Sequence, residues 1–177
     1  RWDKEKRPEQ FLELVRIAYE RDPTIKFVIT TSQEKLKSNK PELIARLRRA
    51  LKDYQNLELR ENQSKEDYYS NLLESKIQFN CADQDFVSWT LLEALLCECI
   101  PVYPNFRSFP EELSSDYLYP KNHMLNAYYL IKHYLDKGRS FEESMKLGSI
   151  VRKHDQAIYK MTQIMKEELE YDGVSVI

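Results

Sequence analysis

The sequence predicts an α/β domain: a Rossmann-like, mostly parallel sheet with helices on both faces, followed by C-terminal helices. Apolar residues at helical spacing alternate at least four times with short runs of apolar, strand-forming residues. Such alternation favours a parallel sheet, because each helix returns the chain to the same edge through a right-handed crossover. Apolar residues make up 42% of the 177 residues, which is enough for the core of about one domain.

The individual elements are predicted by local signals. Pro8 and Pro41 suit the first turns of two helices, and Ser64 with Asp67 forms a capping-box-like start for a third. Further helices are expected at residues 90–97, about 122–136 and 141–170. Strands are expected at residues 26–31, 56–60, 77–79 and 100–103, with an edge strand at 117–119.

We expect two parts in the chain. Residues 1–138 form the Rossmann-like domain, and residues 139–177 form a helical extension packed on it. The extension carries an apolar stripe, which packs on the domain or docks on a partner domain that the chain lacks. The chain begins without Met, at Arg1, inside what reads as a motif, so we expect it to be a piece of a longer protein.

Composition excludes several classes of function. With only 3 glycines, the chain has neither a G-x-G-x-x-G fingerprint nor a phosphate-binding P-loop. The net charge of −2 gives no basic excess of the kind that marks nucleic-acid-binding domains. Cys81, Cys97 and Cys99 form no disulfide or zinc framework, which predicts a reducing, cytoplasmic setting. We find no signal peptide and no apolar run long enough to span a membrane.

Ligands of open parallel sheets bind at the carboxyl ends of the strands, so the loops there are the candidate site. Residues 1–8 form a cation-rich loop directly before a helix, and cations at a helix N-terminus favour phosphate. The alternative is a charged surface loop with no ligand.

A second loop, residues 84–95, carries two carboxylates. Asp85 lies in the loop itself, and Glu93 lies eight residues later among apolar helix residues. A carboxylate in apolar surroundings is costly unless it is paired or faces a ligand, so the two groups are candidates for binding sugar or ribose hydroxyls. The amides near Ser88 and Thr90 face an anion in this interpretation. Alternatively, Glu93 only interacts favourably with the helix dipole.

Three motifs resemble one enzyme family. Arg1, Glu5 and Lys6 match a G-R-x-x-x-E-K-G motif, and residues 85–102 match E-G-F-G-x-x-x-x-E-A-x-x-x-G-x-P-V in order and interval. Pro110-Glu111 matches a later P-E pair. The chain therefore resembles the C-terminal, nucleotide-sugar-binding half of GT-B retaining glycosyltransferases of the group 1 type.

Within that family the chain is most similar to the tRNA-queuosine mannosyltransferase-like subgroup. The shared features are R-W, P-E-x-F, S-K-x-D-Y-Y, D-F and C-x-C-x-P, which lie here at residues 1–2, 8–11, 64–69, 85–86 and 97–101.

The resemblance implies a role for each matching residue. Arg1 and Lys6 neutralise the diphosphate of a nucleotide sugar, Glu93 holds the ribose hydroxyls, and Asp85 contacts the donor sugar. The remaining implied contacts are backbone amides of Val87, Ser88 and Trp89 near phosphate or sugar, and Arg60 beside the base.

The implied activity is transfer of a sugar from a GDP- or UDP-sugar to an acceptor with retention of configuration. No metal or other cofactor is expected. The acceptor is a tRNA, a glycan or a lipid, and an N-terminal acceptor domain is absent from this chain. We therefore expect the isolated domain to be inactive.

The chain departs from the family where glycines are usual. Arg7, Phe86, Ser88 and Glu98 occupy those positions. A left-handed turn at Glu98 would cost roughly 1–2 kcal/mol. These departures support an alternative hypothesis, a catalytically degenerate module that serves protein–protein interaction. A flavodoxin-like or receiver-like domain is a third option, but no acidic cluster follows a first strand.

Overall fold

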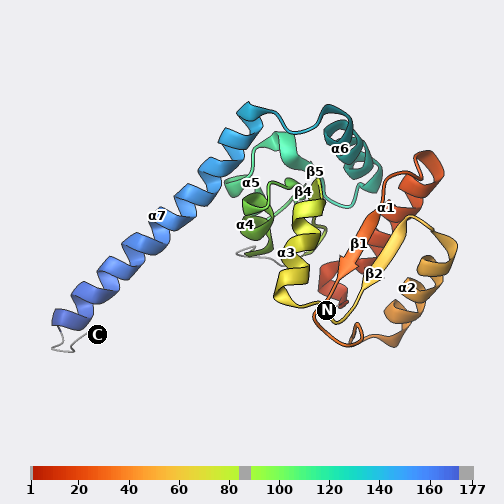
Figure 1. The fold of residues 1–177 in the computed structure, drawn as a ribbon, viewed down its shortest axis with the longest axis horizontal. Coiled ribbons are helices and arrows are strands. Elements are labelled where there is room, and N and C mark those ends of the chain that lie inside the picture. Colours follow the sequence, from red (N-terminus) through yellow and green to blue (C-terminus); the bar gives the residue numbers. More distant parts are fainter. Residues whose placement is uncertain (1, 84–88, 172–177) are drawn as a thin grey trace. The chain divides into compact units, whose positions relative to one another are not determined.

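The computed structural model describes residues 2–83 and 89–171, with side chains up to residue 164 in the last helix. It divides into two units, Arg1–Gly138 and Arg139–Ile177. The first unit alternates strands and helices, and the second is dominated by one long helix (Figure 1). Within the described ranges, no helix is both long and apolar enough to cross a membrane.

The predicted alternation is confirmed. The elements are η1 (Lys4–Lys6), α1 (Pro8–Arg21), β1 (Phe27–Thr30), α2 (Pro41–Asp53), β2 (Leu57–Arg60), α3 (Lys65–Glu74), β3 (Ile77–Phe79), α4 (Trp89–Leu96), β4 (Ile100–Asn105), α5 (Phe109–Glu112), η2 (Ser115–Tyr117), β5 (Leu118–Pro120), α6 (Met124–Lys137) and α7 (Phe141–Tyr171). The sequence did not indicate η1, α5 or η2, which are too short to show a periodic apolar pattern.

The strand pairings are parallel, as expected, but they form two sheets. One sheet has the order β1-β2, and the other has the order β3-β4-β5. Phe27 pairs with Leu57 in the first, and Ile77 pairs with Ile100 in the second. Residues 118–120 form the expected last strand, which pairs with β4 in parallel.

One hydrophobic core joins the two sheets. It combines residues of α1, α2 and α6 with Phe27 and Leu57 of the first sheet and Val102 of the second. The ring of Phe11 in α1 lies 5.9 Å from the ring of Phe27 and 6.2 Å from that of Phe79, centroid to centroid. Phe11 therefore contacts β1 and β3 together.

A second, smaller cluster lies between α3, α4 and the start of β4. It contains Leu72, Ala94 and Cys99, with Tyr68 and Tyr69 packed against it. Strand β4 is buried from Ile100 to Pro104. Burial of successive residues is typical of a parallel strand covered on both faces, so helices on both faces are confirmed.

The start of α3 is set by a capping box. The backbone N–H of Asp67 donates to Ser64 Oγ (3.0 Å), and the backbone N–H of Ser64 donates to Asp67 Oδ2 (2.9 Å). Two backbone donors that the helix itself leaves unpaired are thereby satisfied. The predicted cap is confirmed, and it fixes which residues form the first turns of α3.

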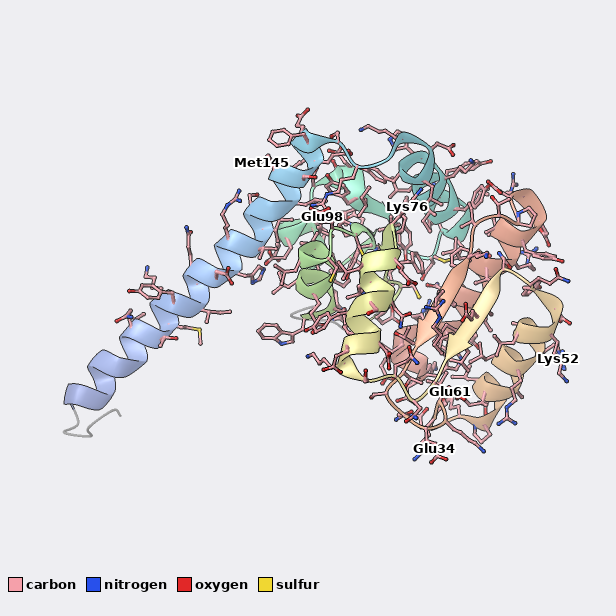
Figure 2. The ribbon with its side chains drawn as sticks, in the orientation of Figure 1. Glu34, Lys52, Glu61, Lys76, Glu98 and Met145 are labelled. Carbon is pink, nitrogen blue, oxygen red and sulfur yellow. The ribbon has the colours of Figure 1, made fainter. Side chains whose placement is uncertain are left out.

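The carboxyl and amino edges of the sheets are easily located. Glu61 follows β2 directly, Lys76 directly precedes β3, and Glu98 lies two residues before the start of β4. Figure 2 shows Glu61 at the opposite end of the unit from Lys76 and Glu98. Helices α3 and α4 therefore begin at the carboxyl edge, where parallel sheets bind ligands.

The unit Arg139–Ile177 contains α7. Its expected apolar stripe is exposed at Ile158, Met161 and Ile164, each about half exposed or more. Packing of this segment on the domain and docking on a partner domain both stay predictions.

The turn that ends α4 has a conformation that glycine usually adopts, but a glutamate occupies it here. The N–H of Cys99 donates to the carbonyl of Ala94 (2.9 Å), and the N–H of Glu98 donates to that of Leu95 (3.1 Å). These two bonds define a Schellman motif, whose turn residue is usually glycine in a left-handed conformation. Here that residue is Glu98, with φ of 64°.

We expect Glu98→Gly to stabilise the protein by about 1 kcal/mol, because a left-handed backbone is strained for a residue with a Cβ. Urea unfolding measures the change. The matched control is Glu66→Gly, an exposed position with helical backbone in α3, where glycine should instead destabilise by up to about 1 kcal/mol. Loss of stability in Glu98→Gly would contradict the strain at this turn.

Candidate functional site

The carboxyl edge of the first unit carries an ion cluster built from three separate loops. Asp83, in the loop after β3, lies 3.4 Å from Arg7 Nε and 2.9 Å from Lys121 Nζ. Its backbone N–H donates to the carbonyl of Glu5 (2.8 Å). Arg7 also donates to the side-chain oxygen of Asn122 (2.9 Å). Loops after β3 and β5 are thus fixed to the segment that precedes α1.

The cluster has an excess of positive charge. Asp83 is one carboxylate between the two cations, each about 31% exposed, and Lys6 beside Arg7 is exposed. The Lys121 ammonium also lies 3.2 Å from the centroid of the Phe106 ring. Partial burial strengthens electrostatic interactions relative to open water. The arrangement can therefore attract an anionic group to the sheet edge.

Arg7 forms the junction between η1 and α1. It adopts a left-handed conformation with φ of 53°, at a position where the resembling family has glycine. Helix α1 starts at Pro8, directly after Arg7, so the N-terminus of this helix lies beside the cluster. A helix N-terminus adds a partial positive charge to the two cations.

Glu93 is the best-defined of the predicted site residues. It is the fifth residue of α4, and its side chain is 24% exposed. Tyr68 OH donates to Glu93 Oε2 (3.0 Å), and Tyr69 OH donates to Glu93 Oε1 (3.2 Å). Lys65 Nζ lies 3.5 Å from Oε1. The carboxylate is paired, so its placement among apolar neighbours carries little desolvation penalty.

The environment of Tyr68 and Lys65 keeps both of these groups protonated. Burial raises the pKa of Tyr68 well above its usual value, and the bond to Glu93 raises it further. The pKa of Lys65 is also raised, first by Tyr69 and then by Glu93. Tyr68 therefore remains a hydroxyl donor at physiological pH, and Lys65 remains charged.

Several predicted site residues lie outside the described part of the chain: Arg1, Asp85, Val87 and Ser88. The expected pairing of Asp85 with Glu93 therefore stays a prediction. Trp89 is the first residue of α4, with a side chain 62% exposed. Its predicted role, like that of Lys6, also stays a prediction.

Arg60 ends β2 at the carboxyl edge, as predicted, and is held by three neighbours. It pairs with Glu58 (2.8 Å) and Glu74 (3.7 Å) and donates to the side chain of Asn71. Glu58 is two residues away on the same strand and therefore on the same face. A base that stacks or bonds beside Arg60 would meet a guanidinium already fixed by acidic partners.

The structure adds four residues to which the sequence assigned no role. Arg7 and Lys121 complete the cation cluster, and Tyr68 and Tyr69 bind Glu93. The tyrosines belong to the S-K-x-D-Y-Y run, which is a usable signal because adjacent polar aromatics follow a capping box. Lys121 gave no signal beyond its place directly after the last predicted strand.

No group of three or more metal-ligating side chains occurs among residues 2–83 and 89–171. No disulfide joins any two of the three cysteines, and burial raises the pKa of Cys81 to about 12. The Cys81 thiol therefore stays protonated and unreactive at neutral pH.

Solved structures with the same fold define its class. The chain matches the pneumococcal O-GlcNAc transferase GtfA, solved with UDP and GlcNAc, with a TM-score of 0.74 at 14% identity, over 96% of this chain and 34% of that one. The catalytic domain of cholesterol-alpha-glucosyltransferase from Helicobacter pylori matches with a TM-score of 0.60 at 15% identity, over 84% and 89%. The fold is that of the Rossmann-like half of a GT-B glycosyltransferase.

A curated relative agrees with this class. The chain is 28% identical over 128 residues to the tRNA-queuosine alpha-mannosyltransferase of Drosophila melanogaster. The aligned residues cover 72% of this chain and 31% of that protein. The chain thus spans about a third of the length of both this relative and GtfA. No family model matches the chain.

Proposed function

We propose that the chain is the donor-binding domain of a glycosyltransferase that transfers a sugar from a GDP- or UDP-sugar to an acceptor with retention. The observation that carries the proposal is the half-buried Glu93 carboxylate in the middle of α4, a helix that begins at the sheet edge that also holds the cations. A carboxylate accepts hydrogen bonds from a ribose diol, and cations bind a diphosphate. One nucleotide sugar presents both groups.

The diphosphate is the leaving group of this reaction. Fixed cations that stabilise its developing charge lower the barrier, and loss of one such contact typically costs about 2–4 kcal/mol. We assign this role to Arg1 and Lys6, as expected from the sequence, and add Arg7 and Lys121. Side chains supply the charge, so the proposal requires no metal ion.

The remaining assignments follow the family resemblance. Asp85 contacts the donor sugar, Arg60 borders the base, and the amides of Val87, Ser88 and Trp89 approach phosphate or sugar. The name of the Drosophila relative and the UDP bound in the GtfA structure support a nucleotide-sugar donor and a tRNA acceptor. Cys81, Cys97 and Cys99 form no disulfide with one another, which supports a cytoplasmic setting.

We further propose that an N-terminal segment completes the domain and brings the acceptor domain. The N–H groups of Phe27 and Thr31 donate to β2, so the backbone of residues 28 and 30 faces the other side of β1. Likewise, the bond from Asn80 N–H to Val102 turns residues 77 and 79 of β3 away from β4. Among the described residues no strand pairs with either of these two edges, and Phe11 contacts both strands, so one added parallel strand suits the place between them.

The alternative remains a catalytically degenerate module for protein–protein interaction. Arg7 and Glu98 keep left-handed backbones without glycine, and α7 exposes Ile158, Met161 and Ile164. A large apolar face on a helix favours contact with another protein.

The proposal is tested on the intact protein, defined as this chain with its N-terminal domain. Purified tRNA is incubated with radiolabelled GDP-mannose, GDP-glucose, UDP-glucose or UDP-GlcNAc, and the label on tRNA and the released nucleoside diphosphate are measured. We expect one donor to yield labelled tRNA and an equal amount of diphosphate. Diphosphate release without label on tRNA would mean that the sugar passes to water and that tRNA is not the acceptor, and release from none of the donors would support the degenerate module.

A further inference from the structure

Two adjacent tyrosines bind the two oxygens of one carboxylate. Tyr68 donates to Oε2 of Glu93 and Tyr69 donates to Oε1, at 3.0 and 3.2 Å. A Glu side chain has several rotatable bonds, and its carboxylate is free to turn when it has one partner. With a separate donor on each oxygen, both the position and the rotation of the Glu93 carboxylate are fixed.

The fold holds the tyrosines firmly enough for this task. The capping box places them in the second turn of α3, and both rings pack against the cluster of Leu72, Ala94 and Cys99. Their ring centroids are 5.5 Å apart. Neither hydroxyl depends on a mobile loop, because α3 and α4 are both described helices within one unit.

We propose that Tyr68 and Tyr69 are positioning residues that orient Glu93 to bind the vicinal hydroxyls of the donor's ribose. This inference rests on the proposed function. A carboxylate offers about four acceptor positions, two on each oxygen. The tyrosines take one on each oxygen, which leaves one on each for a diol. Lys65 approaches Oε1 at 3.5 Å from a side chain that is 69% exposed, so it can yield to a ligand.

Preorganisation of this kind improves affinity because the carboxylate loses little freedom when the ligand binds. The effect is specific for the ribose hydroxyls. It should disappear when the ligand lacks them, whereas a purely structural effect of the tyrosines would remain for every nucleotide.

The experiment measures the affinity of the intact protein for UDP and GDP by calorimetry, and then for the 2′,3′-dideoxy form of the tighter binder. The variant is the double substitution Tyr68→Phe with Tyr69→Phe, which keeps both rings in the cluster. Tyr159→Phe, an exposed tyrosine of α7, is the matched control. Glu93→Gln measures the contribution of the carboxylate itself.

We expect the double variant to bind the ribonucleotide about tenfold more weakly, the size of effect typical of a hydrogen bond to a charged group. Its affinity for the dideoxy form should equal that of the unmodified protein, and the control should change neither. Equal losses for both ligands, no loss, or a gain in ribonucleotide affinity would each overturn the inference. If Glu93→Gln also fails to reduce the preference for ribose, the proposed function fails with it.

Discussion

Replacing Glu93 with glutamine in the intact protein is expected to reduce kcat/KM for sugar transfer by roughly a hundredfold. Glutamine keeps the size of the side chain but removes its charge and one acceptor oxygen. One of its donors, which are Tyr68, Tyr69 and, in the proposed complex, the ribose, then loses its partner. Hydrogen bonds to a charged group are worth about 1.5–3 kcal/mol, which gives the expected factor. Initial rates with the preferred donor measure the effect.

The matched control is Glu98→Gln, an exposed glutamate at the other end of α4. It should transfer sugar at the unmodified rate, and both variants should unfold within about 1 kcal/mol of the unmodified protein. A Glu93→Gln variant that folds and retains full transfer would contradict the assignment. A degenerate interaction module predicts no transfer by any of these proteins.

Replacing Phe11 with alanine is expected to lower the free energy of unfolding by about 3 kcal/mol, the low end for loss of a phenylalanine from a core. Its ring contacts Trp2, Phe27 and Phe79, with centroids 5.9, 5.9 and 6.2 Å away. The substitution opens a cavity where α1 joins β1 to β3, so the two sheets lose one of their shared contacts. Urea unfolding monitored by circular dichroism measures the change.

Phe141→Ala is the control, because the side chain of Phe141 is 83% exposed. It should change the free energy of unfolding by less than about 0.5 kcal/mol. If Phe11→Ala were equally mild, the core would not depend on this residue to join the sheets.

Much of the fold was predictable because its signals are local. Pro8 and Pro41 occupy the first turns of α1 and α2, and Ser64 with Asp67 caps α3, since these effects need only neighbouring residues. The strands followed from short apolar runs between helices. The division into two sheets was not predictable, because strand pairing depends on contacts between residues far apart in the chain.

In the candidate site, too, the features with local signals were predictable and those set by distant contacts were not. Glu93 was identifiable as a carboxylate in an apolar helix, and the left-handed turn considered at Glu98 is present. The partners of Glu93 come from α3, about 25 residues earlier, and Lys121 reaches Asp83 from the loop after β5, which is separated from β3 by β4 in the sheet. Such meetings are set by tertiary packing, and no spacing rule in the sequence encodes them.

The most direct test of the central claim is a calorimetric titration of the intact protein with UDP-sugars and GDP-sugars. Donor binding through Glu93 and the cations predicts saturable, one-to-one binding of one nucleotide class. It also predicts weaker binding in Lys6→Ala and Glu93→Gln, which remove a contact to the diphosphate and to the ribose, respectively. No binding of either class by the intact, folded protein with Arg1 and Lys6 in place would contradict the account.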